Sequence, residues 1–192
     1  AATSSCDSIE LTRTGQTTSY RTGDDGDLEE GRDVDFLTLS SSSIFGNTYR
    51  FTDELGGQTF TNDIIIDWST YNGTDEVLGW YNVPQVDGNW NDSIDAAILK
   101  SIGGFTSGWR MPNRNELNSI VNCEVTPVLN YVPLSQTVNM NFYISTTIPN
   151  ATTQSFYMTL SNGTISKFTK TSGFGGRQMV CRTFTVTGTT LT

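Results

Sequence analysis

The sequence contains no histidine, so the most common general base of enzymes is absent. Neither a Ser-His-Asp nor a Cys-His catalytic arrangement can be built without it. Paired carboxylates, as in glycosidases, are the catalytic chemistry that remains open. No G-x-x-x-x-G-K or G-x-G-x-x-G motif is present to bind a phosphate or a dinucleotide. We therefore predict a protein that is not an enzyme and that needs no cofactor.

Positive charge and long apolar runs are also scarce. The 11 Lys and Arg residues are outnumbered by 20 Asp and Glu, giving a formal net charge of -9 at pH 7. Such a chain repels a polyanionic backbone, so nucleic acid is not expected as a partner. No apolar run approaches the roughly 18 residues that a membrane-spanning helix needs, so direct membrane insertion is not expected.

Cysteine is rare and odd in number. Cys6, Cys123 and Cys181 allow at most one disulfide within the chain. Cys123 and Cys181 are the favoured pair, because both lie in segments patterned like ordered core, whereas Cys6 lies in a polar leading stretch. The alternative is three free thiols in a reducing compartment. No C-x-x-C spacing is present, so a zinc or thioredoxin-like site is not supported, and we predict no metal.

The first residues, AATSS, are not a signal peptide and do not begin with Met. They have the small side chains expected after a signal peptide has been removed, although a trimmed chain is the alternative. Ser, Thr, Asn and Gly are abundant and only three Lys are present, as is typical of exported surfaces. We expect an extracellular or cell-surface protein.

Residues 1–45 are predicted to form an extended N-terminal arm. Residues 8–12 alternate polar and apolar side chains, with Ile9 and Leu11 on one face, as a short strand does. Residues 14–34 have almost no large apolar side chains and cannot bury enough surface to fold alone. The arm must therefore lie on something else or stay mobile.

Residues 46–185 are predicted to form the domain, with residues 186–192 as a C-terminal strand. A first helix over residues 93–102 is expected, capped by Asn91 or Asp92 and ended by two glycines. Its apolar stripe is Ile94, Ala97, Ile98 and Ile102.

A second helix is predicted after Pro112, with Asn113 as N-cap and Glu116 completing a capping box. Its inward face is Leu117, Ile120 and Val121, and it ends near Asn122.

Beyond the second helix the apolar period becomes two, which predicts an antiparallel sheet. The dipeptide Asn162-Gly163 lies between two of the expected strands and indicates a hairpin turn. The expected strands are FYISTT, SFYMTL, TISKFTK and RQMVCRTFTVT.

Several segments together resemble one protein family. They are YRFTDELGGQTFTNDIIIDW, GGFTSGWRMPNRNELNSIV, YISTT, FYMTLSNGTISKFTK and MVCRTF, and TGQTTSYRTGDDGDL resembles a segment that often precedes them. They are similar to the Lcl C-terminal domain family, a bacterial C-type-lectin-like domain named from a collagen-like adhesin. The resemblance implies an α+β, C-type-lectin-like fold with two short helices packed on an antiparallel sheet. It also implies that Cys123 replaces a cysteine common in the first helix of related folds, as partner of Cys181.

An acidic cluster lies in the arm and is interpreted as a solvated charge run, because no apolar neighbours would raise the pKa of its carboxyls. Its members are Asp24, Asp25, Asp27, Glu29 and Glu30. It does not form a calcium loop, because the glycine required at the sixth position falls at Gly31 instead and Phe36 stands where a bidentate Glu is required. The triplet Trp-Asn-Asp at residues 90–92 is interpreted as a helix cap.

Three functions remain, of which an enzyme is the least favoured because His and the common catalytic motifs are missing. In the first, the chain is an exported subunit that polymerises into a filament or surface fibre, with the arm adding a strand to a neighbouring copy through Ile9 and Leu11, near Cys6. Its partner is then the chain itself. In the second, the chain is a monomeric lectin-like adhesin or receptor-binding module, with surface carbohydrate or protein as the partner.

Overall fold

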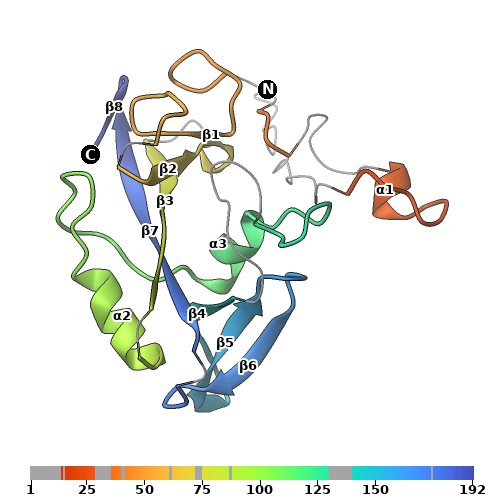
Figure 1. Ribbon diagram of the computed structural model, residues 1–192. Helices are drawn as coiled ribbons and strands as arrows, with labels where there is room; N and C mark the ends of the chain where they lie inside the picture. The colour runs from red at the N-terminus through yellow and green to blue at the C-terminus, as the bar shows by residue number, and fades with distance from the viewer. Residues whose placement is uncertain are drawn as a thin grey trace, which may run out of the picture.

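The computed structural model describes residues 14, 16–28, 36–39, 42–60, 62–71, 75–86, 88–129, 140–173 and 175–192. One mixed sheet organises the domain, in the strand order β1-β2-β3-β7-β4-β5-β6, with β8 paired to β7 (Figure 1). The strands are β1 Phe51–Thr52, β2 Ile64–Asp67, β3 Glu76–Val86, β4 Asn141–Ile148, β5 Ala151–Thr159, β6 Ile165–Thr169, β7 Arg177–Thr187 and β8 Thr190–Leu191. The helices are α1 Asp25–Leu28, the 3-10 helix η1 Trp68–Thr70, α2 Trp90–Ile98 and α3 Arg114–Ser119.

The two longest strands, β3 and β7, form the centre of the sheet and pair antiparallel, with Trp80 opposite Cys181. Only the pairing of β4 with β7 is parallel, among the strand pairs that the structure describes. The result is a sheet-rich α+β fold with few helices. No helix in the described part of the chain combines the length and the apolar character that a membrane span requires.

Apolar side chains alternate along the strands and build a core on each face of the sheet. One core contains Trp80, Phe142 and Leu117 of α3, and the other contains Tyr143, Phe184 and Ala97 of α2. The two helices therefore cover opposite faces.

Helix α3 forms as the sequence predicts. Asn113 is its N-cap, and the side chain accepts from the N–H groups of Asn115 and Glu116, both at 2.9 Å. The Glu116 carboxylate accepts from the Asn113 N–H at 2.7 Å, which completes the capping box. The helix ends at Ser119, three residues earlier than expected.

The predicted start of α2 is wrong by two to three residues. Asn89, not Asn91 or Asp92, is the N-cap, because its side chain accepts from the N–H groups of those two residues at 2.9 and 3.3 Å. Asp92 accepts in return from the Asn89 N–H at 3.1 Å. The predicted apolar stripe is also partly wrong, since Ile98 is 57% exposed.

The strands after residue 140 form as expected. Strands β5 and β6 pair as a hairpin, and Gly163 in their turn has φ +71°, a backbone conformation that favours glycine. Strand β7 continues to Thr187, and β8 folds back on it as a second hairpin. Residues 186–192 are therefore part of the domain's own sheet, and the boundary predicted after residue 185 falls within β7.

Part of the predicted arm belongs to the domain core. Phe36 and Leu39 are only 6% and 7% exposed, and each packs in one of the two apolar cores. The Leu39 N–H donates to the Thr48 carbonyl at 2.8 Å, which holds the segment against the start of the predicted domain. The boundary predicted between residues 45 and 46 therefore falls within a packed unit.

A buried arginine fastens this segment. The Arg50 guanidinium donates twice to the Asp67 carboxylate at 2.9 Å, and both side chains are 0% exposed. It also donates to the carbonyls of Phe36 at 3.3 Å and Ser119 at 2.8 Å. Arg50 thus joins the early segment, β2 and α3, a role that the sequence does not reveal.

Candidate functional site

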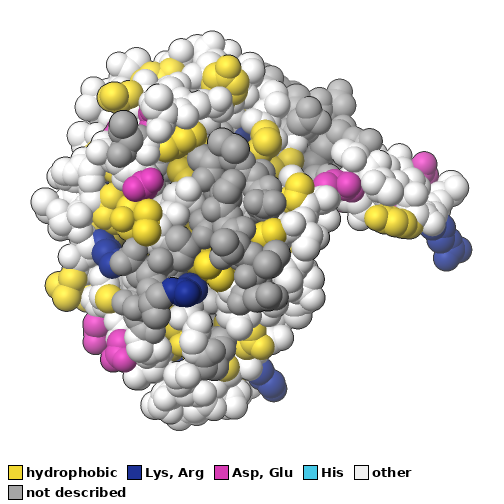
Figure 2. All heavy atoms as spheres, viewed as in Figure 1, with side chains coloured by type: hydrophobic (Ala, Val, Ile, Leu, Met, Phe, Trp, Pro, Cys, Tyr) yellow, Lys and Arg dark blue, Asp and Glu magenta, His cyan; other side chains and the backbone are white. Residues whose placement is uncertain are grey.

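The earlier part of the predicted arm differs from residues 36–39. We call residues 16–28 the leading segment; Figure 2 shows this part of the chain standing out from the body of the domain. Its apolar side chains face outward, with Tyr20 83% and Leu28 55% exposed. No residue of the leading segment belongs to either apolar core.

The leading segment is attached through the loop that follows α3. The Glu124 carboxylate accepts from the N–H groups of Thr17 and Thr18, the latter at 3.0 Å. The Cys123 N–H donates to the Thr14 carbonyl at 2.9 Å. The hydrogen bond from the Thr18 N–H holds the pKa of Glu124 below its usual range. Among the described residues, this attachment consists of hydrogen bonds to one short loop.

The acidic residues near α1 shape a local turn. Asp24 accepts from the N–H groups of Tyr20 at 2.7 Å and Arg21 at 3.0 Å, and these bonds lower the pKa of its carboxyl. Asp27 accepts from the Gly23 N–H at 2.8 Å. Within the described residues, no group of three or more His, Cys, Asp or Glu side chains could hold a metal ion. Glu29 and Glu30 lie outside the described residues.

Strand β6 forms one end of the sheet order, and β1 forms the other. β1 has two residues, both buried, whereas β6 has five, all half-buried or exposed. Figure 1 shows β6 as the outermost strand of its part of the sheet. A long, accessible edge strand is a template for pairing with another chain.

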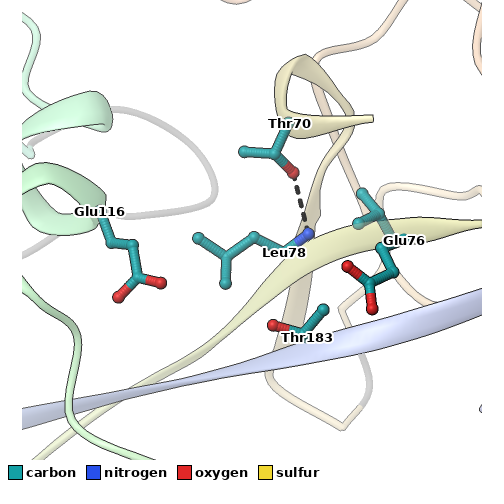
Figure 3. Close-up of a pocket in the computed structure, with 6 residues that line it drawn as sticks. Thr70, Glu76, Leu78, Glu116 and Thr183 are labelled. Atoms are coloured by element: carbon teal, nitrogen blue, oxygen red, sulfur yellow. Dashed lines mark hydrogen bonds between the residues drawn. The ribbon is translucent and has the colours of Figure 1, made fainter. Parts of the chain in front are cut away.

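A shallow cavity of about 250 Å³ lies between β3, β7 and α3. Figure 3 shows the side chains of Glu116 and Glu76 at its two ends, with Leu78 between them. Thr70 also lines it, and its hydroxyl accepts from the Leu78 N–H at 2.8 Å. Hydroxyl and carboxylate groups beside an apolar side chain can form hydrogen bonds to a polar ligand.

Glu116 is committed to structural bonds. Its carboxylate pairs with the Arg110 guanidinium at 2.6 and 2.7 Å. Burial raises the pKa of Glu116, but the bonds from Arg110 and the Asn113 N–H outweigh it and leave the pKa lowered. A carboxyl that stays ionised near neutral pH is a poor general acid.

The predicted disulfide between Cys123 and Cys181 is not formed, and both thiols are free. Cys181 is fully buried on β7, where its sulfur accepts from Arg110 at 3.1 Å. Cys123 lies exposed in the loop after α3. Burial raises the pKa of Cys181, so its thiol stays protonated and is a poor nucleophile. The expectation that both cysteines lie in core segments is right for Cys181 and wrong for Cys123, so the two thiols lie in different environments.

The predicted arm contacts Cys6, Ile9 and Leu11 lie outside the described residues. Sequence reasoning missed the edge position of β6, because this depends on which strands pair and not on any local pattern.

The chain is thus a sheet-rich α+β domain with a projecting leading segment. The family described as the Lcl C-terminal domain matches residues 64–179, which run from β2 into β7. The chain belongs to that family. No curated protein matches the sequence. The leading segment and the C-terminal hairpin lie outside the matched residues.

Proposed function

We propose that this chain is a non-enzymatic, exported structural subunit that self-assembles into an extracellular filament or surface fibre. Its domain has a C-type-lectin-like architecture, which here acts as a scaffold. Its N-terminal arm links neighbouring copies by adding a strand to the next sheet. The observation that carries this proposal is the leading segment, which projects from the domain and exposes Tyr20 and Leu28.

Self-assembly gives the exposed apolar side chains a place to be buried. A segment that contributes nothing to its own core gains stability only from another surface, and a second copy supplies that surface at every step of a polymer. The edge strand β6 offers the backbone groups that an added strand needs. The net charge of -9 supports partners other than nucleic acid.

The experiment replaces Ile9 and Leu11 together by Asp in the full chain. Charge on the apolar face of the added strand opposes burial, so we expect assembly to be lost, as seen by light scattering and negative-stain imaging. The melting transition of the domain should remain nearly unchanged. The matched control is Ser8→Asp with Thr12→Asp, which adds the same charge on the other face of the strand and should preserve assembly. Fibres formed by the Ile9→Asp, Leu11→Asp variant would refute the arm mechanism.

A monomeric lectin-like adhesin is the second candidate, favoured by the cavity with Thr70, Glu76 and Thr183 around Leu78. Hydroxyl and carboxylate groups of this kind bind carbohydrate or polar protein groups. The same measurements separate the two functions. A native chain that remains monomeric at every concentration would favour the adhesin.

A further inference from the structure

The hydrogen bonds of β6 define which of its backbone groups face outward. The Thr159 N–H donates to the Thr164 carbonyl at 2.8 Å, and the Lys170 N–H donates to the Thr153 carbonyl at 2.9 Å. The backbone groups of Thr164 and Lys170, which flank β6, therefore face β5. Bonding groups alternate along an antiparallel strand. The N–H and C=O groups of Ile165 and Lys167 therefore point away from β5.

The two faces of β6 have different chemistry. Lys167 is exposed and pairs with Phe156, whose ring has the Arg114 guanidinium at 5.4 Å. This face therefore carries two cations. On the other face Phe168 stacks on Tyr143 with ring centroids 5.2 Å apart. Tyr157 meets the Phe168 ring edge-on at 5.9 Å, which makes this face aromatic.

Residues 8–12 have the complementary pattern. The acidic residue Glu10 lies on one face of the predicted strand, and the apolar residues Ile9 and Leu11 lie on the other. If Glu10 is placed opposite Lys167, Ile9 comes opposite Phe168 when the strands are antiparallel. Opposite charges and an aromatic, β-branched pair both stabilise neighbouring strands.

We propose that the outer edge of β6 binds residues 8–12 of a second copy in antiparallel register, with Glu10 opposite Lys167. This inference rests on the proposed function and names the acceptor surface of that assembly. Ser8 stands six residues before Thr14, so an extended chain carries it at most about 20 Å from Thr14. The outer edge of β6 in the second copy must therefore lie within that distance of Thr14.

Lys167 also selects the partner. A lysine at a sheet edge opposes pairing between identical edges, because two β6 strands centred on this residue would place like charges together. An arm strand with an acid at its centre relieves that repulsion. The same side chain therefore discourages edge-to-edge association and favours the arm.

The first test uses Lys167→Pro in the full chain. Proline removes an outward N–H that β5 does not use, so the domain should melt as before while the concentration for half-maximal assembly rises about tenfold. Lys167→Thr is the control for the side chain, because it keeps the N–H. Its effect should be smaller than that of proline.

The second test exchanges the charges. Lys167→Glu and Glu10→Lys should each raise the half-assembly concentration about fivefold, and the two together should restore it. Mixing the Lys167→Pro variant with the Ile9→Asp, Leu11→Asp variant should yield paired copies but no fibres, because one intact arm meets one intact edge.

The outcomes distinguish this inference from the proposed function. If assembly is lost with Ile9→Asp, Leu11→Asp but is unchanged by Lys167→Pro and by the charge variants, the arm binds another surface and β6 is not the acceptor. If the native chain does not assemble, both proposals fail. If each copy's arm pairs with its own β6, the mixture remains monomeric, and this also overturns the inference.

Discussion

Two parts of the first 45 residues behave in opposite ways. Residues 36–39 place Phe36 and Leu39 in the cores of their own domain, whereas the leading segment leaves Tyr20 and Leu28 exposed. Both parts have polar neighbours, so average composition does not separate them. The first part is held by hydrogen bonds from Arg50 and to the Thr48 carbonyl, and by the Arg50 guanidinium over the Phe36 ring. Among the described residues, the second is held by hydrogen bonds to Glu124 and, next to it, by the Cys123 N–H bonded to the Thr14 carbonyl.

The way a segment is docked on its own domain decides how easily it can bind a neighbouring copy instead. A segment docked by apolar burial is costly to remove, so it stays with its own copy. A segment held by exposed hydrogen bonds can replace them by hydrogen bonds to water, so its release costs little free energy. In the proposed assembly, the leading segment is therefore the part suited to exchange between copies, and residues 36–39 are not.

The largest effect is expected from breaking the buried pair at Arg50. Arg50→Met leaves the Asp67 carboxylate buried without its cation, and we expect the free energy of unfolding to fall by about 3–5 kcal/mol. Denaturant titration measures it. Combining Arg50→Met with Asp67→Asn removes the unpaired charge and should recover part of the loss. An Arg50→Met variant as stable as the native chain would contradict the stabilising role of the pair between Arg50 and Asp67.

The buried pair of Arg50 and Asp67 could not be predicted from the sequence, whereas some local elements could. Helix α3 could be predicted because its signals, Pro112, Asn113 and Glu116, are adjacent in the chain. Arg50 and Asp67 read as surface residues, since charged side chains are rarely buried, and only the folded chain brings them together. The start of α2 was misplaced because Asn89, Asn91 and Asp92 are equally good caps by sequence.

The candidate site, too, could be predicted only in part. Composition alone indicated that the leading segment could not form a core. It could not show that β6 is an edge, because β7, from the far end of the chain, inserts between β3 and β4. The disulfide prediction failed for a related reason: the apolar pattern around two cysteines does not report where their sulfur atoms lie.

The next effect compares the two parts directly. Phe36→Ala removes a ring that is 6% exposed and stacked with the Arg50 guanidinium at 4.3 Å, so the free energy of unfolding should fall by about 3 kcal/mol. Tyr20→Ala, the matched aromatic deletion in the leading segment, should change it by less than about 0.5 kcal/mol. Thermal or denaturant unfolding of both variants provides the measurement. Equal losses in the free energy of unfolding would show that the leading segment is packed on the domain as strongly as residues 36–39.

The smallest effect concerns the attachment at Glu124. The Thr18 N–H lowers the pKa of this carboxyl in the folded chain, so the attachment is present above the ordinary glutamate pKa of about 4.3 and is lost as pH falls through the lower folded value. The amide resonances of Thr17 and Thr18 should therefore shift together in an acid titration, while those of β3 and β7 stay unchanged. Glu124→Gln should abolish that titration and leave the melting transition in place. Amide shifts that persist in Glu124→Gln would mean that another group holds the leading segment.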